Sequence, residues 1–299
     1  MVNRKETFAS DGLLLITALI WGLAFVAQRK GMDFIGPFTY NGIRFALGGL
    51  SLLPLLIYRY RKGNLNLSFR GESGSRHKLL ISGIFLGLLL FGGASLQQVG
   101  IVYTTAGKAG FITGLYVILV PLAGIFLGQR NKLKIWLGAI LALSGMYLLS
   151  ITGNFSISRG DLFVLFSAFF WTAHVLLIGW LSPKSDSLIL AGMQFTVCSI
   201  LSLITAFFTE IISWTAILQA AVPILYGGIL SVGIAYTLQV VAQKKANPAY
   251  ASIILSLESV FAGIGGYLLL GETLSNRGLL GCCLMFSGML IAQLRFNVH

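Results

Sequence analysis

One carboxylate stands in the middle of an otherwise apolar stretch of the chain. The stretch covers residues 249–270, which is long enough to cross a bilayer, and the carboxylate belongs to Glu258. An ionisable group at bilayer depth costs about 2.5 to 3.5 kcal/mol on insertion scales, so such groups usually face protein or a water-filled cavity and serve function. We therefore expect Glu258 to bind substrate or to exchange a proton, and a purely structural hydrogen bond is the alternative.

Aromatic and amide side chains recur at helical spacing inside other apolar stretches. Tyr236 and Gln239 share one helix face in residues 216–242, and such a face suits a polar ligand between apolar walls. The neighbours Gln97 and Gln98 point about 100° apart on a helix, so at most one of them faces a cavity. Interhelical hydrogen bonding is the alternative interpretation of these side chains.

Two tryptophans occupy matching places in the two halves of the chain. Trp21 and Trp171 would form two aromatic walls of one site, and packing or lipid contact is the alternative. His174 follows Trp171 on the same face and is a candidate proton carrier, because histidine titrates near neutrality, although a lone histidine more often packs and hydrogen-bonds. Tyr116 precedes Pro121, which frees a backbone carbonyl and is expected to bend its helix.

Arg44 lies inside the apolar stretch 38–58 and raises the same question as Glu258. We favour a structural role, in which its guanidinium pairs with backbone carbonyls or snorkels toward water. Gln194 stands at the matching position of the second half. The predicted substrate-binding residues are therefore Glu258, Trp21, Trp171, Tyr236, Gln239, Tyr116, Gln97 and His174, with Glu258 also predicted to couple protons.

The composition excludes an ordinary soluble domain. Apolar residues make up 56% of the chain and charged residues 10%, and the mean hydropathy is +0.86, which indicates a polytopic membrane protein. The net charge of +12 lies mostly between apolar stretches, so it indicates membrane topology and not nucleic-acid binding. The three cysteines show no metal-ligand spacing. We predict no metal, no other cofactor and no nucleic-acid partner.

Ten spans can be drawn along the chain, and all are expected to be helices, because a membrane-crossing segment must satisfy its own backbone hydrogen bonds. They leave no room for a soluble domain. The fold class predicted is an all-α integral membrane protein with ten transmembrane helices. The predicted spans cover residues 11–29, 38–58, 79–101, 105–127, 133–152, 160–181, 187–209, 216–242, 249–270 and 277–295.

The lysines and arginines predict the orientation of these spans. If the N-terminus is cytoplasmic, 15 of the 21 lie in cytoplasmic segments, 5 lie in external segments and Arg44 lies within a span. Such an asymmetry places both termini in the cytoplasm. Arg4 and Lys5 precede the first apolar run as in a signal peptide, but no cleavage site follows, so we interpret that run as a retained span.

The chain also repeats itself. At an offset of 150, residues around Trp21 match residues around Trp171, and at an offset of 143, residues 128–146 match residues 271–289. Five spans per half is an odd number, so the second copy is inserted upside down, and substrate sites of such inverted repeats lie near the midplane between the halves. We predict two inverted five-helix repeats, residues 1–152 and 153–299.

Several short motifs follow one another in a fixed order along the spans. They are Trp21-Gly22 with Phe25, Pro37 with Arg44, Gly110-Phe111 through Pro121, Leu257-Glu258 with Val260-Phe261-Ala262, Leu270-Gly271-Glu272, and Gly281 with Gly288. In these motifs and in its duplicated halves, the sequence resembles the EamA-type ten-helix transporters of the drug/metabolite transporter superfamily over nearly its whole length. The resemblance implies a transporter of small organic molecules, commonly an exporter.

Two positions depart from the family pattern. Ser259 follows the mid-span glutamate where the family often has proline, which puts a kink at that point in question. The first repeat has Gln129 where the second has Glu272, so the first copy lacks that helix-end carboxylate.

The function predicted is secondary active transport, as an exporter of small organic metabolites or amphipathic compounds by alternating access in a bacterial inner membrane. The sequence contains no P-loop, so the energy would come from a substrate gradient or from protons through Glu258. The partners are a small-molecule substrate and the lipid bilayer, and a homodimer remains open. An uptake permease, a passive solute channel and a membrane-embedded lipid-modifying enzyme are the alternatives; dispersed histidines make the enzyme the least favoured.

Overall fold

The computed structural model describes residues 4–65, 76–150, 158–271 and 275–293, and these residues form helices and no strands. Glu272 and Asn154 lie outside the described residues. The elements are α1 (Arg4–Gly31), α2 (Pro37–Arg61), α3 (Arg76–Val102), α4 (Ala106–Gly114), α5 (Tyr116–Phe126), α6 (Leu133–Ser150), α7 (Arg159–Leu181), η1 (Ser182–Lys184), α8 (Ser187–Thr209), α9 (Trp214–Gln219), α10 (Ala221–Leu225), η2 (Tyr226–Tyr236), α11 (Thr237–Ala242), α12 (Pro248–Leu255), α13 (Glu258–Leu270) and α14 (Asn276–Gln293).

Eight helical stretches of the described chain are long and apolar enough to cross a membrane. Three of them combine two successive elements, α4 with α5, α7 with η1 and α12 with α13, and a fourth runs from α10 through η2 to α11. The remaining long helices, α6 and α14, hold shorter apolar segments, Leu133–Leu148 and Asn276–Ala292.

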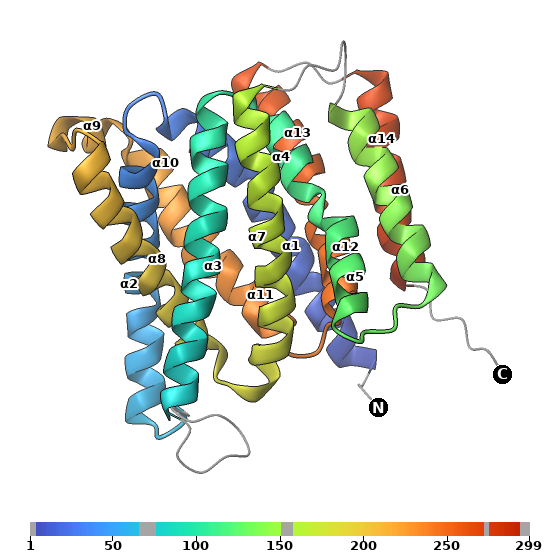
Figure 1. Cartoon of the computed structure of the whole chain (residues 1–299), viewed down its shortest axis with the longest axis horizontal. Helices are drawn as coiled ribbons and strands as arrows, with labels where there is room; N and C mark the ends of the chain where they lie inside the picture. The colour runs from blue at the N-terminus through green and yellow to red at the C-terminus, as the bar shows by residue number, and fades with distance from the viewer. Residues whose placement is uncertain (1–3, 66–75, 151–157, 272–274, 294–299) are drawn as a thin grey trace.

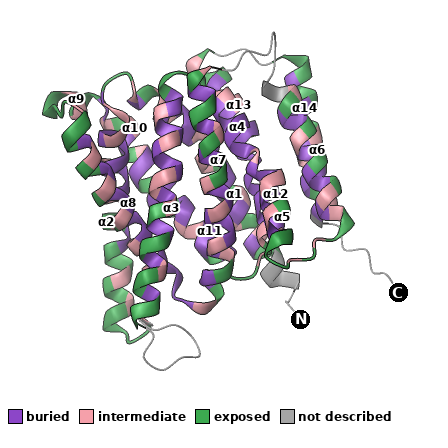
Figure 2. Ribbon diagram, in the orientation of Figure 1, coloured by how far each residue is buried: buried purple, intermediate pink, exposed green. Residues whose placement is uncertain are grey.

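The outside of the molecule is apolar, and the inside holds many of its polar side chains. Leu50, Phe85 and Phe166 are more than half exposed, whereas Gln98, His174 and Gln194 are fully buried. Figure 2 shows buried residues gathered in the middle of the bundle and exposed residues along the outer helices. This arrangement fits lipid as the surrounding solvent, and the chain is a multi-pass membrane protein.

Paired helices organise the bundle. α6 and α14 stand together at one side of it, and α2 packs along α8 at the opposite side (Figure 1). Both glycine-rich faces of the first pair touch backbone to backbone, since a Cβ added to Gly138 would lie 2.7 Å from the Gly288 carbonyl oxygen. The start of α1 and the end of α14 lie at the same end of the bundle.

Specific side chains fix where several helices begin. Ser158 and Asp161 form a capping box at the start of α7, in which each side chain accepts a hydrogen bond from the other residue's backbone N–H. Asn247 caps α12 ahead of Pro248, whose fixed φ suits the first helical turn. Glu210 reaches across from the end of α8 and accepts hydrogen bonds from two backbone N–H groups at the start of α2.

Three predicted spans are not continuous α-helices. The span predicted at 105–127 is interrupted at Leu115, between α4 and α5, six residues before Pro121, which itself lies inside α5. The span predicted at 249–270 is interrupted at Ser256 and Leu257, just before Glu258, although no proline follows it. The span predicted at 216–242 contains the π-helix η2.

Candidate functional site

Glu258 is the first residue of α13, directly after the break. Gly22 of α1 packs against this point of the chain, because a Cβ added to Gly22 would lie 2.6 Å from the Glu258 carbonyl oxygen. A larger residue than glycine would push α1 away from α13. This close approach places Trp21 and Glu258, which come from opposite ends of the sequence, beside the same interior space.

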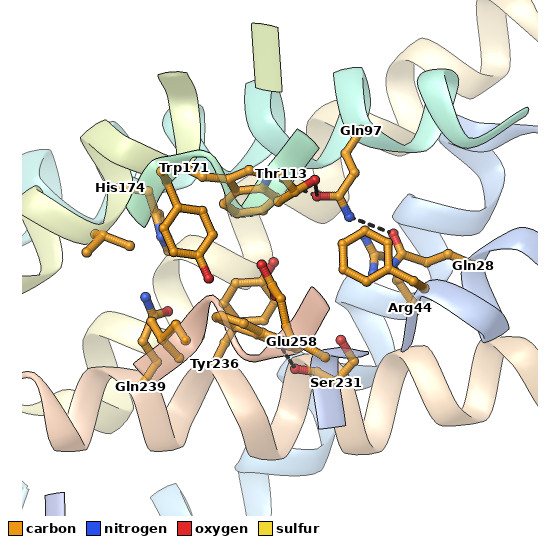
Figure 3. Close-up of a pocket in the computed structure, with 15 residues that line it drawn as sticks. Gln28, Arg44, Gln97, Thr113, Trp171, His174, Ser231, Tyr236, Gln239 and Glu258 are labelled. Carbon is orange, nitrogen blue, oxygen red and sulfur yellow. Dashed lines mark hydrogen bonds between the residues drawn. The ribbon is translucent and has the colours of Figure 1, made fainter. Parts of the chain in front are cut away.

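That space is a cavity of about 30 Å³ at the centre of the bundle, with room for about two water molecules. Its walls come from both halves of the sequence, and Figure 3 shows Gln28 and Arg44 at one end, His174 and Gln239 at the other, and Glu258 between them. The lining residues are Trp21, Phe25, Gln28, Arg44, Gln97, Thr113, Tyr116, Trp171, His174, Val175, Ser231, Tyr236, Gln239, Leu255 and Glu258.

All eight side chains predicted to bind substrate line this one cavity. They come from six regions that are distant in sequence: α1, α3, α5, α7, α13 and the stretch from η2 to α11. The structure therefore brings the predicted residues together. That these residues bind substrate stays a prediction.

Gln97 is the centre of a hydrogen-bond network on one wall. Its Oε1 accepts hydrogen bonds from Trp171 Nε1 at 2.9 Å and from Thr113 Oγ1 at 3.4 Å, and its Nε2 donates to Gln28 Oε1 at 3.0 Å. Its neighbour Gln98 points away from the cavity and donates to the Gln28 backbone carbonyl. The network joins α1, α3, α4 and α7, and it holds the Trp171 ring in place.

Tyr236 lies at the middle of an aromatic cluster. The centroid of its ring is 4.5 Å from that of Trp21, 6.2 Å from that of Trp171 and 6.1 Å from that of His174. Distances of this size are typical of favourable tilted and edge-to-face aromatic pairs. The cluster forms an apolar wall with polar groups at its rim.

His174 is held by an amide of α8. Its Nε2 lies 2.7 Å from Gln194 Oε1, and the ring is fully buried. A neutral ring that donates from Nε2 satisfies this contact and leaves Nδ1 as an acceptor, for which no partner exists in the described part of the chain. The contact favours a positioned, neutral imidazole over a free proton carrier.

Several polar atoms of the cavity lack a hydrogen bond within the described residues. They include Glu258 Oε1, the Tyr116 hydroxyl and both amide atoms of Gln239. The Tyr116 hydroxyl and the Glu258 carboxyl are close enough to interact, without the geometry of a good hydrogen bond. Buried polar groups are normally paired, so these atoms are ready to bind water or a polar ligand.

Arg44 also lines the cavity, which corrects the interpretation that it snorkels toward water. The side chain is 2% exposed, its Nε donates to Asn41 Oδ1 at 2.9 Å, and its guanidinium lies over the rings of Tyr40 and Phe45. α2 lies between α8 and η2 at this level, so the long side chain has no route to the surface.

Two polar residues that were not predicted from the sequence, Ser231 and Thr113, also line the cavity. Ser231 lies five residues before Tyr236, which is the wrong spacing for one face of an α-helix, but the i→i+5 hydrogen bonding of the π-helix η2 widens each turn and brings the two nearer to one face. Thr113 carries no signal in the sequence beyond a hydroxyl in an apolar stretch. Gln243, one helical turn after Gln239, donates to the Val175 carbonyl and does not line the cavity.

Small residues near Glu258 make room for helices. A Cβ on Gly265 would meet Leu23 and Val26 of α1, and a Cβ on Gly110 would lie 3.0 Å from Ala262. Ser259 donates to the Gly110 carbonyl at 2.7 Å and thereby ties α13 to α4. Among the described residues, no three His, Cys, Asp or Glu side chains gather as a metal site would require.

Known proteins resemble this chain over nearly its full length. A protein of Archaeoglobus fulgidus described as an uncharacterized transporter is 33% identical over 296 residues, which cover 97% of this chain and 87% of the relative. The uncharacterized inner membrane transporter YedA of Escherichia coli is 23% identical over 279 residues, 89% of this chain and 84% of YedA. One crystal structure shares the fold with a TM-score of 0.75 at 19% identity, covering 95% of this chain and 96% of the other.

The EamA-like transporter family matches the sequence twice, over residues 9–151 and over residues 158–293. Together the two matches take in every residue that lines the cavity. The chain is therefore a member of the EamA-like transporter family.

Proposed function

We propose that the chain is a secondary active exporter of small organic metabolites or amphipathic compounds, working by alternating access. One observation carries the proposal: a cavity lined by both halves holds a carboxylate, Glu258, that has no ion-pair partner among the described residues. Aromatic walls with a few convergent polar groups are typical of small-molecule sites. Glu258 is the group that exchanges a proton, and the other seven predicted residues bind the substrate.

The size of the cavity supports alternating access. About 30 Å³ holds water but no metabolite, so the helices must separate before a substrate enters. Lys108 Nζ lies 2.6 Å from Asp161 Oδ2 and joins α4 to α7 at one end of the bundle. Arg59 and Asp186 pair at 2.8 Å between α2 and η1–α8 at the other end. These contacts belong to an arrangement that is closed around the site.

The proposed architecture is two inverted repeats, residues 1–152 and 153–299, with ten transmembrane helices. Contacts that exchange between the halves support it. Trp21 of the first half donates to the Ser231 carbonyl of the second, and Trp171 of the second half donates to Gln97 of the first. At the level of helices, α1 therefore contacts η2 and α7 contacts α3, which is the exchange that a two-fold relation between the halves requires.

The α6–α14 pair supports the same two-fold relation and the proposal of ten transmembrane helices. At an offset of 143, Gly138 corresponds to Gly281 and Gly145 corresponds to Gly288. Gly138 packs against the Gly288 carbonyl, and Gly145 packs against the Gly281 carbonyl. Each helix has 18 residues, or about 27 Å at 1.5 Å per residue, so each comes close to the hydrocarbon thickness of about 30 Å.

The proposed setting is a bacterial inner membrane with both termini cytoplasmic. The charge asymmetry supports the orientation, and the description of the relative YedA as an inner membrane transporter supports the membrane. A homodimer is compatible with this setting. Cysteines introduced between Arg61 and His77 should resist an impermeant reagent added outside intact cells, and one introduced at Asn154 should react. Reaction of the first set from outside would overturn the orientation.

The deciding experiment is solute flux through sealed vesicles that contain the purified full chain. A secondary exporter moves solute against its gradient when a pH gradient is imposed, and the movement stops when the pH gradient is collapsed. Downhill flux alone, unaffected by the pH gradient, would indicate a channel. Accumulation on the cytoplasmic side of the protein would indicate an uptake permease. Chemical change in the lipids would indicate a lipid-modifying enzyme. The absence of flux for every solute tested would contradict a transport function.

A further inference from the structure

Arg44 is a buried cation without a counter-ion in the described part of the chain. It is 2% exposed, and no Asp or Glu side chain of the described residues forms an ion pair with it. A guanidinium remains charged under all conditions that proteins meet. Burying such a charge without a partner is costly, and in a membrane an inward-facing cation marks a functional site.

The neighbours of Arg44 orient it but leave most of its donors unused. Asn41 Nδ2 donates to the Ala94 carbonyl at 3.1 Å, which fixes the amide, and Asn41 Oδ1 then accepts from Arg44 Nε. The guanidinium carbon lies 5.4 Å from the Tyr40 ring centre and 4.9 Å from that of Phe45. Among the described residues, one of its five N–H donors is therefore bound, and the rings favour a cation without neutralising it.

The charge appears once on a repeated scaffold. At the position in α8 that matches Arg44, the chain has Gln194, which is neutral and holds His174. The cavity is therefore positive at the end where Arg44 and Gln28 lie, and Glu258 stands between that end and His174 (Figure 3).

Resting on the transport function proposed above, we propose that Arg44 binds a carboxylate group of the substrate. A guanidinium fork matches the two oxygens of a carboxylate. A phosphate carries nearly two negative charges, and the single Arg or Lys side chain that lines this cavity would compensate only one of them. The aromatic wall around Tyr236 then takes an apolar or aromatic body. The substrate class is an organic acid with an apolar body, and a second, cationic group on the same molecule would lie toward Glu258.

Three probes with one aromatic body separate the charged groups. They are 3-phenylpropionate, which has the carboxylate alone, phenethylamine, which has the ammonium alone, and phenylalanine, which has both. Binding to the purified full chain in detergent is measured by calorimetry and by the shift of the unfolding temperature. We expect the wild type to bind both carboxylates more tightly than phenethylamine.

Substitutions at Arg44 then assign the effect. Arg44→Gln should weaken both carboxylates about tenfold or more, the value of one or two charge-assisted hydrogen bonds, and should leave phenethylamine unchanged. Arg44→Lys keeps the charge, loses the planar fork and should weaken them less. The matched control is Arg61→Gln, which removes an equal charge from an exposed position of the same helix outside the cavity and should change none of the three.

Each outcome decides for or against the carboxylate. Wild-type preference for phenethylamine, no binding of either carboxylate, or equal carboxylate binding by Arg44→Gln would overturn the proposal. If Arg44→Gln does not fold, Arg44→Lys and the wild-type preference still decide it. Vesicle flux distinguishes failure of this proposal from failure of the transport function. If phenethylamine or other solutes move but no carboxylate does, the role of Arg44 is refuted and transport stands. If no solute moves, transport itself is refuted.

Discussion

The two broken helices of the molecule share a backbone design and differ in chemistry. α5 begins at Tyr116 after the break at Leu115, and α13 begins at Glu258 after the break at Leu257. Each ends at a glycine with positive φ, Gly128 at 75° and Gly271 at 69°. Both breaks turn a side chain into the cavity, but one carries a phenol and the other a carboxyl.

α2 and α8 likewise pair in the structure and differ in the chemistry of one side chain. The two helices pack along each other, and Arg44 in the first corresponds to Gln194 in the second. Under the proposed repeat the scaffold is close to symmetric, whereas the two charged groups of the cavity occur on one copy each. The symmetric parts set geometry, and the asymmetric residues set what the cavity binds. Mutations in corresponding elements of the two halves can test this division.

The largest expected difference is between Glu258→Gln and Tyr116→Phe. Glutamine keeps the size of Glu258 and most of its hydrogen-bonding capacity but cannot exchange a proton, so transport should fall at least about tenfold or lose its pH dependence. Phenylalanine at Tyr116 removes a hydroxyl that has no partner in the described chain, so transport should fall less.

Flux against external pH in vesicles at matched incorporation measures both variants. Asp33→Asn is the control, because Asp33 forms exposed pairs with Arg29 and Lys30 outside the cavity. Identical pH curves for wild type and Glu258→Gln would leave Glu258 with a structural role.

Asp161→Asn should give the next largest effect, on stability. Asp161 accepts hydrogen bonds from Lys108 Nζ at 2.6 Å and Thr104 Oγ1 at 2.8 Å, and it completes the capping box with Ser158. Loss of the charge should cost about 2 kcal/mol, less than a fully buried pair because Lys108 is 31% exposed. Thermal unfolding in detergent measures the cost, and Asp33→Asn should move the midpoint little. A midpoint equal to that of the wild type would mean that the contact does not join α4 to α7 in solution.

A smaller difference in stability is expected between substitutions of the two tryptophans. Trp171→Phe removes the 2.9 Å donor to Gln97 Oε1 inside the network, and the cost should be about 1 to 2 kcal/mol. Trp21→Phe removes a 3.3 Å hydrogen bond to the Ser231 backbone carbonyl, and the cost should be under about 1 kcal/mol. Unfolding midpoints of the two variants give the comparison. Equal losses would show that both rings act through packing alone.

Helical periodicity was enough to predict most of the cavity wall. Trp21, Trp171 and Tyr236 are large side chains in apolar runs, and the 3.6-residue period assigns them to faces with polar neighbours. The resemblance to EamA-type transporters supplied the family, which the matches over both halves confirm. The ten crossings and the inverted repeat stay predictions.

The breaks in the helices could not be predicted from proline. The break at Leu257 follows two serines, and each hydroxyl donates to the carbonyl three residues back, Ser252 to Ala249 and Ser256 to Ile253. Such bonds compete with the helix ladder and bend it, but serines do so in some contexts and not in others. The snorkelling predicted as one alternative for Arg44 was wrong for a related reason, since whether a long cation reaches water depends on which helices surround it.

The smallest effects are expected where the two halves are most alike. Gly128 and Gly271 end the broken helices with φ near +70°, and nothing lies within 4 Å of an added Cβ at either. Alanine there meets backbone strain and no clash, so each substitution should cost about 1 kcal/mol. Gly12→Ala, inside α1 and equally open, should instead stabilise slightly because alanine favours a helix. Unfolding midpoints of the three variants measure this. A clear difference between Gly128→Ala and Gly271→Ala would mean that the two helix ends are not equivalent, and the near symmetry of the scaffold would then stop short of its loops.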